Sequence, residues 1–166
     1  MYEFIFRQFF KENSLAVVAF LCFVSSNQRN FQNRKMRKNK FFNFSGFDFI
    51  PVVFWMGVIF YFSSLKGEVS ISEPSLYFYL ERKGAHVAEY FILMILLINL
   101  FLRSFRTRLE VILFSGAIAL FYSFSDEFHQ TFVSGREGKI SDIGFDLIGI
   151  TLAGLIAWMI LRSKKH

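Results

Sequence analysis

The fold of this chain is decided by residues 84–102, which read GAHVAEYFILMILLINLFL. From Phe91 onward only Asn99 is polar, and as a helix the 19 residues extend about 28 Å, enough to cross the hydrocarbon core of a bilayer. The first turns instead carry His86 and Glu89, which are costly to place inside a membrane. The stretch therefore predicts a membrane-spanning helix with a polar N-terminal end.

Three further apolar runs predict additional spans. Residues 143–161 form one, and residues 49–65, with Pro51 in the first turn, form another. Residues 111–124 make only about 21 Å of helix, so this run crosses a membrane only if the helix continues through the polar residues up to Gln130. Since 54% of the chain is hydrophobic and these residues come in long runs, we expect an all-α integral membrane four-helix bundle.

The first 45 residues are predicted to form a hydrophobic and basic N-terminal extension, ahead of a four-span domain at 46–166. The extension holds an apolar run at 15–24 that is too short to span a membrane. A cleaved signal peptide fits poorly, because a basic block and no small-residue cleavage site follow the run. An interfacial helix, a marginal extra span and a native start at Met36 are the open alternatives.

Basic residues are distributed unevenly among the loops that flank the spans. Six lie between positions 29 and 40, three between 103 and 108, and three between 162 and 165. The two alternate loops carry only Lys66, Arg82, Lys83, Arg136 and Lys139. Because lysine and arginine are enriched on the cytoplasmic side of membrane proteins, we expect a multi-pass protein of the cell membrane with both ends of the four-helix unit in the cytoplasm.

Three polar stretches border or enter the spans and hold six of the thirteen acidic residues. They cover residues 82–90, 125–130 and 135–146, at the start of the second span, the end of the third and the start of the fourth. The loop charges place all three at the extracytoplasmic face. The sequence thus predicts a polar site at one membrane surface, with a network of ion pairs that locks the helix ends as the structural alternative.

The residues of these stretches divide into two groups of candidates. Neighbouring carboxyl groups can take separate acid and base roles when their surroundings differ. The candidates for catalysis are Glu89, Asp126, Glu127 and His86. The candidates for ligand binding are Lys83, Tyr90, Gln130, Arg136, Ser141, Asp142 and Asp146.

The carboxylate of Glu89 needs a compensating cation, because the residue lies within the apolar part of its span. Lys83, His86 and Arg136 are the candidates, and Arg136 is favoured since a guanidinium can hold a carboxylate or phosphate at two points. Ser141 is expected to cap the last helix. The glycines of that helix are expected at close contacts between helices: Gly144, Gly149 and Gly154.

The sequence offers metal-ligand types without a recognised metal motif. His86 and Glu89 are three residues apart, a mix that zinc or manganese accepts, and Asp126 with Glu127 could bind a divalent cation through oxygen. No HExxH or similar motif is present, and the single cysteine, Cys22, rules out an intramolecular disulfide. We therefore assign no metal ligands, leave the cofactor unknown, and find no pattern for nucleic-acid binding.

Three strings of the sequence resemble the VanZ-like membrane proteins in order, spacing and hydropathy. They are WMGVIFYFSS from Trp55, RKGAHVAEYFILMILL from Arg82 and SDEFHQTFVSGREGKISDIGFDLIG from Ser125. The third is the most specific, because Asp-Glu-x-x-Gln-x-Phe followed by Gly-Arg and Ser-Asp is hard to obtain by chance. The resemblance covers roughly residues 50–160 and departs from the pattern at Ser134, where the family often has proline.

The resemblance implies a membrane protein whose outward polar pocket binds or acts on a lipid-linked molecule of the cell envelope. The family is named for a protein associated with low-level resistance to teicoplanin, a lipid-tailed glycopeptide. Two alternatives stay open: a membrane enzyme with acid–base or phosphate-directed chemistry, and a structural or partner-binding protein. The substrate, any reaction and the oligomeric state are left open by the sequence.

Overall fold

The computed structural model describes residues 46–66, 76–102, 104–105, 107–136 and 138–163. The expectations for residues 1–45 lie outside this part of the chain. Within it every regular element is a helix, in agreement with the predicted all-α class. The elements are η2 (Gly46–Phe49), α3 (Ile50–Ser64), α4 (Leu76–Phe101), α5 (Arg108–Gln130) and α6 (Ile140–Ser163).

Four helical segments are long and apolar enough to cross a membrane, so all four predicted spans are confirmed. Their apolar stretches are Gly46–Ser64, Arg82–Phe101, Arg108–Gln130 and Ile140–Arg162. As the length argument required, α5 continues through Asp126 and Glu127 to Gln130. The chain is therefore built as a multi-pass membrane protein.

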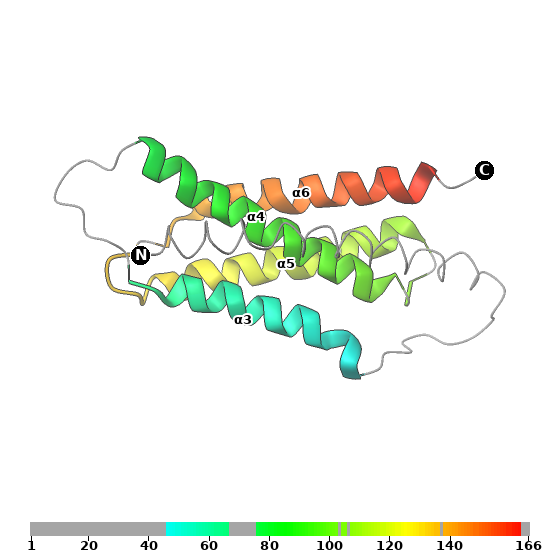
Figure 1. The fold of residues 1–166 in the computed structure, drawn as a ribbon, viewed down its shortest axis with the longest axis horizontal. Helices are drawn as coiled ribbons and strands as arrows, with labels where there is room; N and C mark the ends of the chain where they lie inside the picture. The colour runs from blue at the N-terminus through cyan, green and yellow to red at the C-terminus, as the bar shows by residue number, and fades with distance from the viewer. Residues whose placement is uncertain (1–45, 67–75, 103, 106, 137, 164–166) are drawn as a thin grey trace.

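The four helices alternate in direction and lie lengthwise beside one another (Figure 1). The central helix is α4, which contacts α3, α5 and α6. In an apolar window of 18 residues of α4, 72% of the residues are buried inside the protein, against 28%, 28% and 33% in windows of the same length in η2 with α3, in α5 and in α6. Large apolar side chains on the outer helices remain exposed, including Phe54, Phe121 and Leu155, and a surrounding bilayer would cover them.

Two long-range side-chain hydrogen bonds attach α3 to its neighbours. The indole Nε1 of Trp55 donates to the backbone carbonyl of Glu89 in α4 at 2.9 Å. The Tyr122 hydroxyl of α5 donates to the carbonyl of Met56 at 2.7 Å. Polar bonds of this kind matter between membrane helices, because lipid supplies no hydrophobic driving force to press helices together.

Helices α4 and α6 approach each other closely at Gly149. A Cβ atom at this position would overlap the carbonyl oxygen of Val87 and lie 3.0 Å from the backbone nitrogen of Phe91. Gly154 makes a looser contact, 3.6 Å from Met94 Cε, whereas Gly144 has nothing within 4 Å. The expectation of close packing is thus wrong for Gly144, which lies on an exposed side of α6.

The helix ends differ in how their free backbone groups are satisfied. At the start of α5 the Thr107 hydroxyl accepts from the Glu110 amide, and the Thr107 amide donates to Glu110 Oε2, both at 3.2 Å. This reciprocal pair is a capping box. The expected cap at Ser141 is wrong, because α6 begins one residue earlier at Ile140 and the Ser141 hydroxyl instead donates to Asp142 Oδ1 at 3.1 Å.

Replacing Thr107 with alanine should lower the free energy of unfolding by about 1 kcal/mol, because an amide at the start of α5 loses its acceptor. Thermal unfolding in detergent measures the change. Glu110→Gln is the matched control, since glutamine also closes a capping box and should unfold close to wild type. Equal midpoints for Thr107→Ala and wild type would show that the cap does not stabilise the helix.

Candidate functional site

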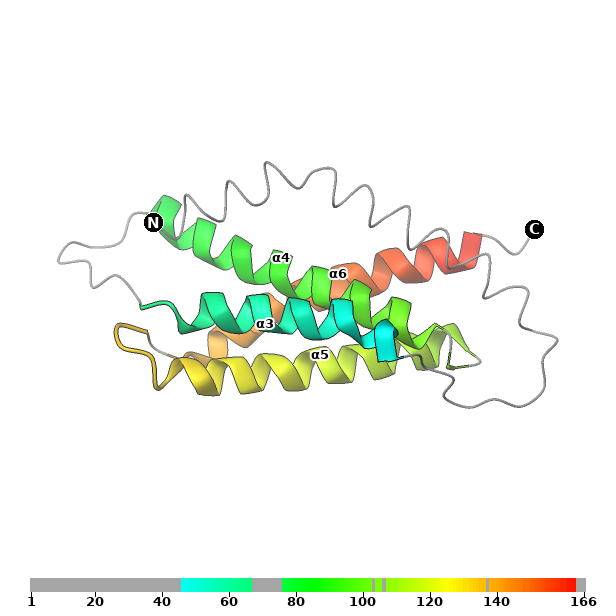
Figure 2. The same ribbon diagram turned by 60° about the horizontal axis from the view of Figure 1, so that its bottom comes forward.

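The three polar stretches meet at the end of the bundle where α4 and α6 begin and α3 and α5 end (Figure 2). Side chains from α4, α5 and α6 are buried there, joined by a half-buried arginine from the loop between α5 and α6. We call this group the polar cluster. Its members are Lys83, His86, Glu89, Tyr90, Ser123, Asp126, Glu127, Gln130, Arg136, Asp142 and Asp146.

Two pairs of charged or polar side chains join α4 to α6 in successive helical turns. Lys83 Nζ donates to Asp142 Oδ1 in a buried ion pair. His86 Nδ1 lies 3.1 Å from Asp146 Oδ1. Lys83 and His86 are three residues apart on α4, and Asp142 and Asp146 are four apart on α6. Either spacing places two side chains on the same face of a helix, one turn apart. The two pairs therefore join residues that are far apart in the sequence and hold the first turns of α6 against α4.

Helix α5 contributes a polar face to the cluster. The Ser123 hydroxyl donates to Asp146 Oδ2 at 2.6 Å, and Gln130 Nε2 donates to Asp126 Oδ2 at 2.9 Å. Glu127 Oε2 accepts from the backbone amide of Lys139 at 3.0 Å. The end of α5 is therefore fixed both to α6 and to the loop that connects α5 with α6.

Arg136 ties the loop between α5 and α6 to the end of α3. Its Nε and Nη2 donate to the carbonyls of Leu65 and Phe62, each at 2.9 Å, and its Nη1 donates to Gln130 Oε1 at 3.3 Å. The final carbonyls of a helix have no partner within the helix, and here the guanidinium supplies one. The expected pairing of Arg136 with Glu89 is not among these hydrogen bonds and stays a prediction.

The Glu89 carboxyl group is buried, with 4% of the residue exposed. Its Oε1 has no hydrogen-bond partner within the described residues, and the other two expected cations, Lys83 and His86, pair with aspartates of α6. The same holds for Asp126 Oδ1 and Glu127 Oε1, which are buried and without a partner in the described part of the chain. The cluster thus contains three carboxylate oxygens able to accept from a ligand.

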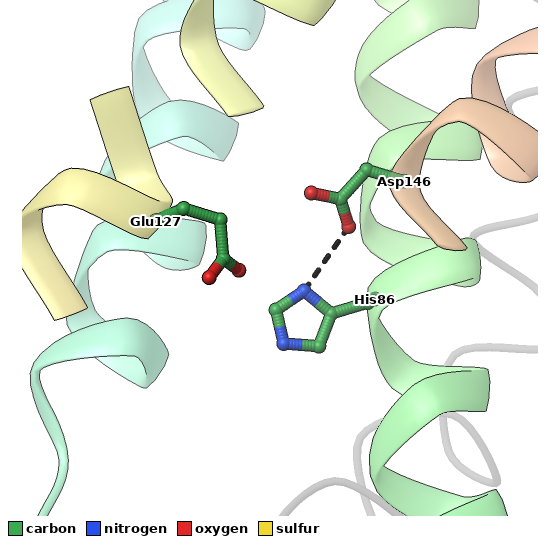
Figure 3. A group of neighbouring side chains, drawn as sticks. All are labelled: His86, Glu127 and Asp146. Carbon is green, nitrogen blue, oxygen red and sulfur yellow. Dashed lines mark hydrogen bonds and ion pairs between the residues drawn. The ribbon is translucent and has the colours of Figure 1, made fainter. Parts of the chain in front are cut away.

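Three members of the cluster, one from each of three helices, converge closely (Figure 3). His86 of α4, Glu127 of α5 and Asp146 of α6 each offer one ligand atom, and these atoms all lie within 4.8 Å of one another. All three residues are buried. The spacing of His86 and Glu89 along one helix suggested these two as metal-ligand types, whereas the fold groups His86 with Glu127 and Asp146.

Tyr90, Ser141 and Ser123 differ in how they relate to the cluster. Tyr90 is fully buried with its ring 6.4 Å from that of Tyr122, and Ser141 is exposed at the edge of the cluster. Ser123 was not among the candidates, although it bonds to Asp146. The signal was present, since Ser123 precedes Asp126 by three residues and Gln130 by seven, which puts them on one helix face.

His129 lies outside the cluster, although Gln130, which follows it in the sequence, belongs to it. Its Nε2 is 3.0 Å from the Ser64 hydroxyl, and its ring stacks on Phe60 with centroids 4.5 Å apart. The residue therefore serves the contact between α5 and the end of α3.

Four candidate spans that enclose a charged cluster at one end define a multi-pass membrane protein with a buried polar site. The VanZ/LLP1 family model matches residues 14–162, and the chain belongs to this family. The match takes in the whole four-helix unit and also part of the N-terminal extension. No curated protein and no solved structure matches the chain.

Proposed function

We propose that the polar cluster binds the headgroup of a lipid-linked cell-envelope molecule. The observation that carries the proposal is the burial of unpartnered carboxylate oxygens on Glu89 and Asp126 at one end of the membrane spans. A buried acceptor without a donor is costly, so a ligand that supplies donors is favoured. Hydroxyl, amide and ammonium groups, which sugar- and peptide-bearing lipid headgroups carry, are donors of this kind.

The cluster lies on the side of the two loops that are poor in lysine and arginine, which supports an extracytoplasmic location in the cell membrane. In this orientation the headgroup of an outer-leaflet lipid would reach the cluster from the membrane surface. The exposed apolar side chains of the outer helices would contact the lipid tails. Glycopeptide resistance follows from the same proposal, because the lipid tail of teicoplanin would hold the drug at the surface where the cluster acts.

Lipid retention tests the proposal. We expect wild-type protein purified from bacterial membranes to retain a lipid with a hydroxyl-, amide- or amine-bearing headgroup, enriched over its share of the bulk membrane. Asp126→Asn should retain at least about tenfold less, because an amide presents a weaker acceptor and a competing donor. Mass spectrometry of extracted lipids measures both.

The control variant is Phe121→Leu, which alters an exposed apolar residue on the same helix and leaves the cluster intact. It should retain the lipid as wild type does. If wild type, Asp126→Asn and Phe121→Leu all carried the lipid composition of the bulk membrane, the cluster would not be a headgroup site.

An enzyme acting on the same lipid is the second candidate, favoured by the contact between His86 and Asp146. A carboxylate that holds one imidazole nitrogen orients the ring for proton transfer. The retained lipid distinguishes the two readings. Chemical change of its headgroup by wild type and not by His86→Gln would establish turnover, whereas an unchanged headgroup would establish binding alone.

A further inference from the structure

We infer that His86, Glu127 and Asp146 bind one divalent transition-metal ion, Zn²⁺ or Mn²⁺. The three side chains come from three different helices and point toward a common region (Figure 3). Their potential ligand atoms lie within 4.8 Å of one another. The inference concerns the metal alone and does not rest on the proposed lipid.

The spacing of the three groups suits a shared ion. Ligands that each lie about 2.0–2.2 Å from one ion are roughly 3–3.5 Å apart. The separation of His86 Nδ1 from Asp146 Oδ1 is 3.1 Å, within that range. The ligand atom of Glu127 lies within 4.8 Å of both others, and its side chain would move to complete the site if that separation exceeds the range.

The hydrogen bonds around these residues leave ligand atoms available. Glu127 is 5% exposed; its Oε2 is held by the Lys139 amide, and its Oε1 has no partner in the described part of the chain. Asp146 is fully buried, and the Ser123 hydroxyl holds its Oδ2 while Oδ1 faces His86. Outer hydrogen bonds that orient ligating carboxylates in this way are a regular feature of metal sites.

The charge balance of the polar cluster also favours a bound cation. Its permanent cations, Lys83 and Arg136, are outnumbered by five carboxyl groups, which leaves three negative charges if all are ionised and His86 is neutral. Buried unpaired charge is strongly destabilising. A divalent ion among His86, Glu127 and Asp146 would offset two of the three charges. The five carboxyl groups belong to Glu89, Asp126, Glu127, Asp142 and Asp146.

The ligand types select the kind of metal. Calcium and magnesium prefer sites made entirely of oxygen, whereas imidazole together with carboxylates suits zinc and manganese. One histidine and two carboxylates leave further coordination positions for water or for a ligand group. Neutral imidazole and ionised carboxylates are the binding forms, so binding should weaken in acid.

A metal titration of the wild-type protein is the primary test. The protein, purified in detergent without a polyhistidine tag, is stripped with a chelator and titrated with Zn²⁺, Mn²⁺ and, for comparison, Mg²⁺. Elemental analysis by mass spectrometry should find about one Zn²⁺ or Mn²⁺ bound per chain and no retained Mg²⁺. If neither Zn²⁺ nor Mn²⁺ bound above the detergent background at saturating concentration, the site would not exist.

Matched variants locate the ion. His86→Gln and Glu127→Gln should each weaken binding at least about 100-fold, and Ser123→Ala, which removes an outer hydrogen bond, by about 10–100-fold. His129→Gln is the control, because this histidine is near the cluster but outside the three-residue group. Circular dichroism and size-exclusion chromatography confirm that each variant is folded. Tight binding by His86→Gln, or equal loss in His129→Gln, would overturn the assignment.

The two proposals fail separately. If wild type bound no metal, the metal site would be excluded. The lipid proposal would still stand, because its test compares lipid retention by wild type with that by Asp126→Asn. Conversely, a protein that bound one zinc ion but no enriched lipid would keep the metal site and lose the proposed function.

Discussion

Gly149→Ala should leave little folded protein in the membrane. The added methyl group would overlap the Val87 carbonyl, and backbone cannot move aside as a flexible side chain can. Because the methyl group would force α4 and α6 apart, the free energy of unfolding should fall by about 3 kcal/mol or more, at the upper end of what overpacking costs. The same contact positions His86 against Asp146, because Val87 directly follows His86 and Gly149 lies one turn beyond Asp146.

Gly144→Ala provides the matched control for this prediction. It makes the same chemical change on the same helix, where a Cβ atom meets nothing within 4 Å. Alanine favours helix over glycine by up to about 1 kcal/mol, so this variant should be as stable as wild type or more so. Fluorescence-detected size-exclusion chromatography after heating compares the three proteins. Equal survival of Gly149→Ala and Gly144→Ala would show that the helices do not approach as described.

Lys83→Met should destabilise the protein by about 3–5 kcal/mol, because it strands the Asp142 carboxylate in a buried position. The Ser141 hydroxyl would remain as a neutral donor to that carboxylate and cannot replace the lost charge. The midpoint of thermal unfolding in detergent reports the loss.

The double variant Lys83→Met with Asp142→Leu tests the cause of that loss. Removing both charges restores an apolar contact between α4 and α6, and replacement of a whole buried pair is often neutral or stabilising. The double variant should therefore recover most of the lost stability. If it unfolded as early as Lys83→Met, or if the single variant matched wild type, the ion pair would not be what holds these helix ends.

The spans could be predicted from the sequence because length and hydropathy alone determine them. The continuation of α5 to Gln130 followed from the same argument, since fourteen apolar residues are too few to cross. That the polar stretches meet followed from the alternation of direction in an antiparallel bundle. Each of these conclusions needs only the order of residues along the chain.

The pairing of individual side chains could not be predicted in this way. Which groups meet depends on how each helix is rotated and how deeply it is inserted, and Gly149 fixes both for α4 against α6. Arg136 was expected near Glu89 as a counter-charge, but its hydrogen bonds to the free carbonyls at the end of α3 could not be foreseen from the order of residues. Ser123 was not among the candidates, although it shares a helix face with Asp126 and Gln130, so its role as a donor to Asp146 was overlooked.

The central claim is that the polar cluster carries function and does more than hold the helices together. Glu89 and Asp126 test it best, because each has a carboxylate oxygen without a partner in the described part of the chain. Neutralising such a group removes no ion pair, so Glu89→Gln and Asp126→Asn should accumulate like wild type. Any loss of function in these variants cannot then be attributed to misfolding.

The most direct measurement is drug susceptibility in cells that lack the native gene and express wild type, Glu89→Gln or Asp126→Asn at matched membrane levels. The comparison is between teicoplanin and vancomycin, which lacks the lipid tail. We predict that wild type protects against teicoplanin only and that both variants lose this protection at unchanged abundance. Full protection by both variants, or no protection by wild type, would contradict the proposed role of the cluster.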